Sequence, residues 1–388
     1  MMRLITCVSC QSEEEIWCFD EQIYALCKIN KESLQAECVI VPMEIIKDSD
    51  YEVRQMVVWR DKILILPVQL NQRWIIYDKN TGMLEYGYFC KENYRSSACV
   101  LRGDSLVLLP ACAKDPVAIL DLQERKIINR HYIQDFSLIP DDKMEIWEAR
   151  VDQRNIFFLI KGTRYYGKIR NQEICFIKTH TPEPLLCADF YENSGWAVGS
   201  CGKYLYQFNE KGILLKSFFI DLKTEIARII VKAKYIFFLP LEGNSIWIFD
   251  RKSEKVKTVS MEMKKSVSIF PPLLTVLHYW DYVEIKHEIW LLPLRHPLLI
   301  IDTDTGRIQQ KEITYTDKFS TMKYWSCCNY VRNIRKQSSF FNENAEGELE
   351  KYMQLIQCNI DIPEKENECC GKIIWKTVVK MNRGEKRE

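Results

Sequence analysis

One pattern recurs along the chain and constrains its fold more than any other feature. It consists of an apolar strand-like run, a Leu-Pro pair, a short polar stretch, a second apolar run and an aspartate. Four segments contain the whole pattern and end at Asp78, Asp121, Asp250 and Asp302. Three weaker copies lack the proline. The third position of each copy follows the previous one by 39 to 53 residues, at Phe19, Pro67, Pro110, Ile160, Gly199, Pro240 and Pro293.

Each copy also contains the strands of one complete structural unit. The second copy has four β-prone runs, at 55–59, 62–66, 73–78 and 83–89. Its two middle runs are almost wholly apolar, as strands between neighbouring sheets must be, and its last run is more polar. A period of 40 to 50 residues with four short strands per unit is typical of a β-propeller. The chain is therefore predicted to be all-β, a seven-bladed β-propeller over residues 1–318; the alternative is a two-sheet sandwich with accidental similarity between its segments.

Turn residues at fixed places in the repeat support this prediction. Asp78 and Asp302 each begin an Asp-x-x-Thr-Gly sequence that ends at Gly82 and Gly306. An aspartate can accept hydrogen bonds from the backbone two residues on, and glycine tolerates a positive φ, so each sequence predicts a tight hairpin before the last strand. The prolines cannot donate to a sheet ladder, so we expect them to end the second strand of their blades at equal height.

The repeat pattern is no longer recognisable after the last copy. Residues 319–388 are predicted to form a short, partly helical C-terminal extension. A run from Thr321 resembles one more strand, 347–357 and 370–382 have helical spacing, and the last residues form a frayed terminus. We expect this extension to pack on the propeller through Trp325, Phe340, Phe341 and Trp375, because so many exposed aromatic side chains would promote association.

The repeat resembles the kelch-type and quinoprotein-like β-propeller superfamily at the level of the fold. The Asp-x-x-Thr-Gly hairpins are similar to the turn between the third and fourth strands in quinoprotein-like propellers. Kelch repeats have a double glycine after the second strand, of which only Gly199 and Gly202 give a partial trace. No Trp-Asp pair ends a blade, so the chain does not resemble a WD40 array. Propellers have many functions, and the resemblance therefore implies little about activity.

Composition limits the possible partners and the compartment. The 54 basic and 53 acidic residues nearly cancel, so no basic excess indicates nucleic-acid binding. No segment is long and apolar enough to predict a membrane span, and the N-terminal sequence does not resemble a signal peptide. We therefore expect a cytoplasmic protein whose 16 cysteines are reduced thiols. Most of them lie in apolar runs and are expected to be buried, among them Cys27, Cys38, Cys99, Cys175 and Cys187.

No catalytic or cofactor motif stands out. Cys7 and Cys10 form the single CxxC, without the second pair that a structural zinc site usually needs. Of the histidines, only His287 and His296 lie close in sequence. The chain contains no glycine-rich phosphate loop and no nucleophile elbow. We expect no metal and no cofactor, and the catalytic residues, if any exist, are unknown from sequence.

One set of charged residues suggests a binding site. In a propeller, the loops between second and third strands open on one face around the central axis. The repeat assigns cations to these loops in five of the seven blades, whereas blades 1 and 6 have Asp20, Glu21 and Glu242. A ring of cations would suit a carboxylate or phosphate. The simpler interpretation is that loops are polar in general. The candidate ligand-binding residues are Arg73, Lys114, Lys161, Arg164, Lys203, Arg295 and His296.

These observations favour a non-enzymatic binding or scaffolding propeller. Its ligand would be an anionic small molecule, an acidic glycan or a protein partner on the face formed by those loops. The alternative is an enzyme that acts on a sugar or other small polar substrate in the central channel. Carboxylates that converge in the channel with raised pKa values would favour the enzyme.

Overall fold

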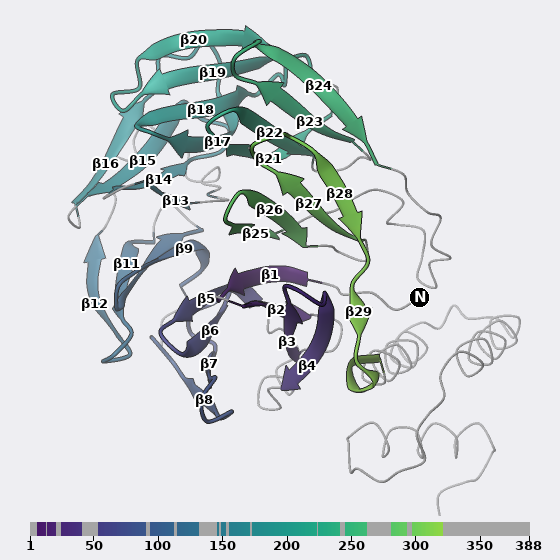
Figure 1. Ribbon diagram of the computed structural model, residues 1–388. Helices are drawn as coiled ribbons and strands as arrows, with labels where there is room; N and C mark the ends of the chain where they lie inside the picture. The colour runs from purple at the N-terminus through teal and green to yellow at the C-terminus, as the bar shows by residue number, and fades with distance from the viewer. Residues whose placement is uncertain are drawn as a thin grey trace, which may run out of the picture.

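The structure is a computed structural model of the chain. It describes residues 6–12, 14–20, 25–40, 53–90, 94–111, 115–131, 146, 149–152, 155–170, 173–222, 224–240, 245–261, 281–292 and 297–320. Twenty-nine strands occur in this part of the chain, and they group into seven sheets. The sheets surround a common centre (Figure 1). The predicted seven-bladed β-propeller is therefore confirmed.

Each blade consists of four consecutive antiparallel strands, numbered from the innermost outwards. The strands of blades 1 to 3 are β1 (Thr6–Gln11), β2 (Glu15–Asp20), β3 (Ala25–Asn30), β4 (Gln35–Ile40), β5 (Val53–Trp59), β6 (Lys62–Pro67), β7 (Trp74–Asp78), β8 (Leu84–Gly87), β9 (Ser96–Arg102), β10 (Ser105–Pro110), β11 (Val117–Asp121) and β12 (Lys126–His131).

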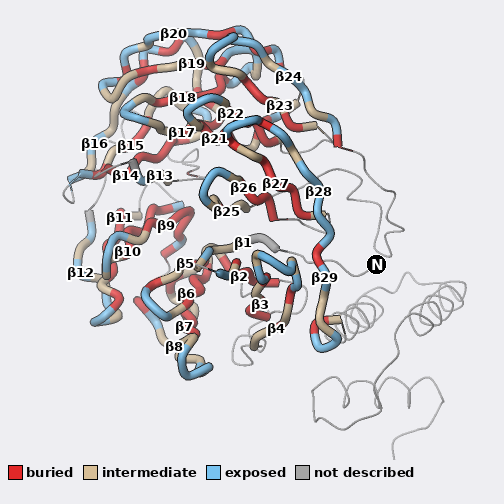
Figure 2. Tube along the Cα trace, in the orientation of Figure 1, coloured by how far each residue is buried: buried red, intermediate tan, exposed pale blue. Residues whose placement is uncertain are grey.

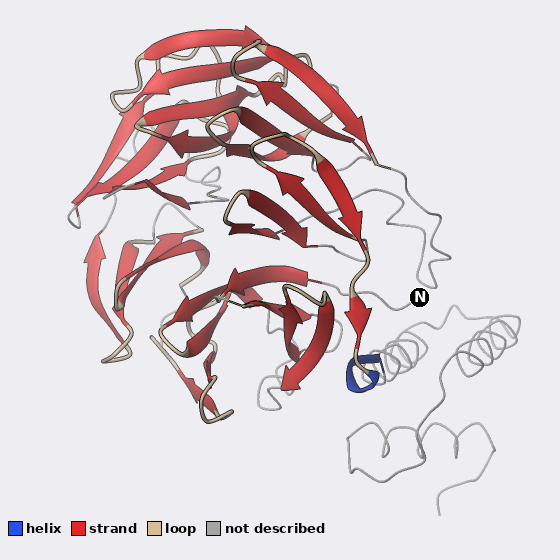
Figure 3. Ribbon diagram, in the orientation of Figure 1, coloured by secondary structure: helices blue, strands red, loops and turns tan. Residues whose placement is uncertain are grey.

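The same order continues through the rest of the ring. The strands of blades 4 to 7 are β13 (Ala149–Asp152), β14 (Asn155–Leu159), β15 (Tyr165–Arg170), β16 (Glu173–Lys178), β17 (Leu185–Tyr191), β18 (Ser194–Gly199), β19 (Tyr204–Asn209), β20 (Leu214–Phe219), β21 (Ile226–Val231), β22 (Tyr235–Pro240), β23 (Ser245–Asp250), β24 (Lys255–Ser260), β25 (Asp281–Ile285), β26 (Glu288–Leu292), β27 (Leu298–Asp302) and β28 (Ile308–Lys311). A last short strand, β29 (Thr314–Tyr315), precedes a helical turn at 317–320 (Figure 3).

The strand order gives the propeller two different faces. We call the face with the second-to-third-strand loops the loop face, and the face with the first-to-second and third-to-fourth turns the hairpin face. The repeat position predicted to form a level ring lies at the loop face. Pro67, Pro110 and Pro240 end their second strands, as predicted, and Gly199 does the same. Pro293 lies outside the described residues.

Burial decreases from the second and third strands towards the rim, as Figure 2 shows. In β6, only the first of six residues is not buried, whereas β24 has no buried residue. The reason is that strands in the middle of a blade pack against neighbouring blades on both sides. The buried apolar residues form seven clusters, and each joins two neighbouring blades. The apolar core is therefore divided among the blade interfaces.

The predicted hairpins occur with the expected chemistry. The Oδ1 atom of Asp78 accepts hydrogen bonds from the backbone N–H groups of Asn80 and Thr81, at 3.0 and 3.1 Å. Gly82 then has a φ of +70°. The same turn follows the third strand of five other blades, where it begins at Asn30, Asp121, Asn209, Asp250 and Asp302. In three of these six turns the positive φ falls on a residue that is not glycine, at Leu34, Arg125 and Glu254.

The ring closes between blade 7 and blade 1, which we call the seam. Strand β29 pairs in parallel with β4, with Thr314 opposite Gln35. Blade 1 therefore has five strands, the last of which comes from the far end of the propeller. Phe319 is fully buried in the cluster that joins blades 7 and 1. Of the 319–388 extension, only this residue and Ser320 are described, so its predicted strand and helices lie outside the described residues.

Of the five cysteines named above as examples of buried thiols, four are buried: Cys27, Cys38, Cys99 and Cys187. The prediction was wrong for Cys175, which is exposed. Its run of apolar residues forms β16, the outermost strand of blade 4, where side chains have no neighbouring blade to cover them. The nine cysteines whose side chains are described have free thiols.

Candidate functional site

The loop face is the site that the sequence predicted, and the structure describes three of its loops completely. These are 68–73 in blade 2, 160–164 in blade 4 and 200–203 in blade 5. Together they contain four cationic residues, Arg73, Lys161, Arg164 and Lys203, and no aspartate or glutamate. The other predicted residues, Lys114, Arg295 and His296, lie outside the described residues.

Arg73 is held against the rim of its own blade. Its Nε donates to the hydroxyl of Tyr88 at 2.9 Å, and its guanidinium lies 6.0 Å from the centre of the Tyr88 ring. Tyr88 follows β8, the outermost strand of blade 2, and is exposed. Arg73 is therefore directed along the loop face, towards the rim.

Two cations of blade 4 contact the segments that lead into the following blades. Arg164 donates to the carbonyl oxygen of Pro182, just before blade 5. The ammonium of Lys161 lies 3.6 Å from the carboxylate of Glu225, just before blade 6. In blade 5, Lys203 is exposed. These four cations lie in loops of three blades, and the contacts of Arg73, Arg164 and Lys161 run to three different segments, so they form a spread of positive charge.

A half-buried carboxylate holds the blade 5 loop in place. Glu183 accepts hydrogen bonds from the Cys201 backbone N–H at 2.9 Å and from the Tyr206 hydroxyl at 2.8 Å. The Ser200 hydroxyl and the Cys201 thiol donate to the same group. Burial opposes ionisation of Glu183, but these hydrogen bonds outweigh it and lower the pKa of the carboxyl. These hydrogen bonds fix the shape of loop 200–203.

Three further arginines, which sequence reasoning missed, lie in first strands next to the ring axis. Arg54, Arg150 and Arg228 belong to blades 2, 4 and 6. Arg150 reaches across the axis, because its Nη1 lies 3.6 Å from Glu284 of blade 7. The signal that could have found them is a cation inside the first strand of alternate repeats, where the middle strands of the repeat are apolar.

Two of these arginines meet on one aromatic ring. The guanidinium groups of Arg150 and Arg228 lie 5.0 and 5.1 Å from the centre of the Tyr282 ring. Arg150 also pairs with Asp189 of blade 5 at 3.0 Å. Lys232 of blade 6 forms an ion pair with Glu284. Side chains from blades 4, 5, 6 and 7 thus meet at the axis.

Polar side chains link first strands of neighbouring blades. Asp189 of blade 5 accepts a hydrogen bond from the Val231 backbone N–H of blade 6 at 2.8 Å. Asp281 of blade 7 accepts from both the backbone N–H and the hydroxyl of Ser9 in blade 1, at 2.6 and 2.8 Å. Gln55 of blade 2 exchanges two hydrogen bonds with the Cys99 backbone of blade 3. These contacts hold the ring together at its centre.

Asp281, near the ring axis, has a carboxyl group with a raised pKa. Burial raises the pKa of Asp281 to about 6, against the opposing effects of Arg228, Ser9 and Arg150. Its Oδ2 accepts the two Ser9 hydrogen bonds, and its Oδ1 accepts one from the Tyr282 backbone N–H at 2.9 Å. Both oxygens therefore have structural partners, which indicates a role in ring closure.

Within the described residues, no group of three or more histidine, cysteine, aspartate and glutamate side chains could hold a metal ion. The described residues also include no helix that is long and apolar enough to cross a membrane. No protein-family model matches the chain, and no curated protein matches it in sequence.

Solved structures with the same architecture do match. Virginiamycin B lyase from Staphylococcus aureus, in a catalytically inactive form with quinupristin, is 11% identical, with a TM-score of 0.57 over 75% of this chain and 92% of that one. A chain of the mitotic checkpoint complex is 12% identical, with a TM-score of 0.51 over 80% and 87%. The computationally designed protein Ika8 is 10% identical, with a TM-score of 0.52 over 81% and 90%. At these identities the likeness extends to the propeller fold alone.

Proposed function

We propose that this protein is a non-enzymatic binding propeller that takes an acidic ligand on its loop face. The observation that carries the proposal is the composition of the three complete loops, which have four cations and no carboxylate. The four loop cations outnumber the two carboxylates that contact these loops, Glu183 and Glu225. Such an excess of one sign on one face attracts oppositely charged partners even when the whole protein is nearly neutral. The ligand class is an anionic small molecule or an acidic glycan, with an acidic protein segment as a further form of the same chemistry.

Side chains lie on the ring axis, which supports binding on the loop face and not inside the channel. Arg150, Tyr282 and Glu284 bring blades 4 and 7 into contact, so the described side chains occupy the axis at that level. Arg228 and Asp281 lie opposite Leu239 and Leu292, near the ends of their second strands and close to the loop face. A ligand on this face would therefore meet a polar floor beneath it.

The alternative, an enzyme acting on a sugar in the channel, has less support. Asp281 has the raised pKa that such a mechanism could use. Its two oxygens are engaged by Ser9 and Tyr282, however, and no second carboxyl with a raised pKa converges on it among the described residues. We also propose that the protein is related to kelch-type or quinoprotein-like propellers and that it is cytoplasmic.

The test is a calorimetric titration with sulfated and uronic-acid oligosaccharides. The triple variant Arg73→Ala, Arg164→Ala, Lys203→Ala should bind at least about tenfold more weakly, because each charge-assisted contact contributes roughly 1.5–3 kcal/mol. Added salt should weaken binding to the native protein, because the groups are close to solvent.

A matched variant removes three exposed lysines from the hairpin face: Lys126→Ala, Lys211→Ala, Lys255→Ala. It should bind as the native protein does. Equal loss in both triple variants would mean that the attraction depends only on total charge. Failure of every acidic ligand to bind the native protein would also reject the proposal.

A further inference from the structure

Large apolar side chains gather on the outer edge of blade 5, at the rim of the propeller (Figure 1). Eight large hydrophobic residues are exposed in the described part of the chain, and four of them belong to β19, β20 or the turn between them. These four are Tyr204, Ile213, Leu215 and Phe219, with exposed fractions of 40%, 45%, 53% and 65%. The rings of Tyr204 and Phe219 are in contact, with centroids 5.7 Å apart. An exposed apolar patch of this kind is typical of an interaction surface.

The outer strand of blade 5 differs from the outer strands of blades 1 and 6. In blade 1 the outer strand is covered, because β29 pairs with β4. In blade 6, β24 exposes Lys255 and Lys257, and such charges discourage pairing with another strand. β20 has a single charged residue, Lys216, and its outer edge pairs with no strand among the described residues. Figure 2 shows most of β20 exposed, so this edge is open to a partner.

The backbone of β20 directs hydrogen-bonding groups outwards. Along an antiparallel pair, the residues that bond to the partner strand alternate with residues that do not. The N–H of Ile220, directly after β20, donates inwards to the Lys203 carbonyl oxygen at 2.8 Å. Ser217 and Phe219, at odd spacings from Ile220, therefore direct their N–H and C=O groups away from β19. A further strand can pair with these groups.

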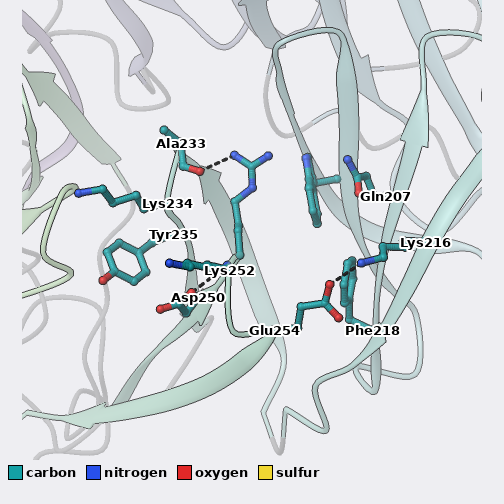
Figure 4. Close-up of a pocket in the computed structure, with 11 residues that line it drawn as sticks. Gln207, Lys216, Phe218, Ala233, Lys234, Tyr235, Asp250, Lys252 and Glu254 are labelled. Atoms are coloured by element: carbon teal, nitrogen blue, oxygen red, sulfur yellow. Dashed lines mark hydrogen bonds and ion pairs between the residues drawn. The ribbon is translucent and has the colours of Figure 1, made fainter.

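The charge on β20 is neutralised within the chain. Lys216 forms an ion pair with Glu254 of blade 6 and lies over the Phe218 ring (Figure 4). Lys216 and Phe218 thus lie on the side of the strand that faces blade 6. Side chains alternate along a strand, so Ser217 and Phe219 lie on the other side. Leu215 is the extra residue of a bulge in the pairing with β19 and is exposed.

The sequence of β20 is complementary to itself in an antiparallel pairing. When two copies pair about Ser217, Leu215 of each copy lies opposite Phe219 of the other, so the exposed apolar residues cover one another.

The charges at the ends of β20 also favour a second copy of this chain as the partner. Asp221 of one copy lies opposite Ile213 of the other, two residues beyond Lys211. Asp221 and Lys211 are both exposed, so opposite charges become neighbours at both ends of the pairing. An unrelated strand has no reason to match both the apolar and the charged positions.

We propose that this protein forms a two-fold symmetric dimer in which the β20 strands of two copies pair antiparallel about Ser217. The pairing joins the two four-stranded sheets of blade 5 into one continuous sheet. A two-fold axis uses the same patch of both copies, as is usual for homodimers. Because the strand direction reverses across the axis, the loop faces of the two propellers point in opposite directions, and both stay accessible.

Sedimentation equilibrium of the full chain over a dilution series measures the dimer Kd. Leu215→Lys and Phe219→Lys should each raise it at least about 100-fold, because each change occurs twice in a symmetric interface. Met83→Lys is the matched control, since Met83 is a more exposed apolar residue on blade 2. It should change the Kd less than about twofold.

Ser217→Cys tests the register of the pairing. The two introduced thiols would lie directly opposite each other, with Cα atoms about 5.5 Å apart, a distance that a disulfide can span. Oxidised glutathione should therefore cross-link this variant into a covalent dimer. Ser253→Cys, at an exposed turn of blade 6, is the matched control and should cross-link no more than the native protein, which has exposed thiols at Cys175 and Cys201.

The loop-face triple variant should dimerise normally, so this proposal and the proposed function can fail separately. The dimer is rejected if the native chain is monomeric at every concentration, including the case in which a foreign protein binds at β20. It is also rejected if the two β20 variants dissociate no more than Met83→Lys, or if Ser217→Cys cross-links no more than Ser253→Cys.

Discussion

Blades 5 and 6 meet through a continuous chain, whereas blades 7 and 1 come from opposite ends of the propeller. At both interfaces an aspartate of one first strand accepts a backbone N–H of the next, Asp189 from Val231 and Asp281 from Ser9. The seam has further contacts: the Ser9 hydroxyl bonds to Asp281, β29 pairs with β4, and Phe319 fills the apolar cluster. Additional noncovalent contacts thus take the place of a connecting segment.

The largest expected effect tests whether the seam is as strong as a continuous interface. Phe319→Ala removes a fully buried ring from the seam, and Phe249→Ala does the same between blades 5 and 6. Each should lower the free energy of unfolding by about 3–5 kcal/mol, measured by urea denaturation. A loss below about 1 kcal/mol for Phe319→Ala alone would show that the ring stays closed without its last residues.

The pH dependence of the seam gives the next effect. The pKa of Asp281 is about 6 in the folded protein, above its ordinary value of 3.8. The folded state therefore binds this proton more tightly, and the resulting stabilisation is complete below about pH 3.8 and is lost as the pH rises through 6.

Asp281→Asn removes this titration. Relative to the variant, the native protein should lose up to about 3 kcal/mol of stability between pH 4 and 7, measured by urea denaturation at each pH. Parallel pH profiles for the two proteins would contradict the proposed environment of Asp281.

A smaller effect, of opposite sign, is expected at a turn beside the seam. Lys286, between β25 and β26, has a φ of +53°, a conformation that glycine adopts at little cost. Lys286→Gly should raise the free energy of unfolding by about 0.5–1 kcal/mol. The matched change Lys234→Gly, in the equivalent turn of blade 6, should destabilise instead, because Lys234 has no positive φ. Destabilisation by both changes would contradict the assigned turn.

The smallest expected effect concerns the thiols. Cys18, Cys27 and Cys38 lie opposite one another across three strands of blade 1 and are buried at the seam. We expect no disulfide among them in the native protein, so a reducing agent should leave the Tm nearly unchanged. A fall of many degrees would mean that an oxidised pair stabilises the seam and that the protein does not reside in a reducing compartment.

The parts of the structure that depend on local chemistry were predictable from the sequence. Pro67 and Pro110 end strands because proline lacks an N–H donor, and Asp78 begins a hairpin because its carboxylate accepts the turn. The seam could not be predicted, because β29 pairs with a strand almost 280 residues away and is only two residues long. Arg150 was missed because its partners belong to two strands of other blades, β17 and β25, which only the closed ring brings together.

The parallel pairing of β29 with β4 also has a consequence for biosynthesis. The apolar residues with which blade 1 meets blade 7 include Ile16, Cys18 and Cys27, and they are synthesised well before Trp290 and Phe319, which cover them. Ribosomes add about 5–20 residues per second, so this face stays uncovered for roughly 15–55 s. During that time it is open to association with other nascent chains. A cell-free synthesis without chaperones should therefore yield more aggregate than one that contains them.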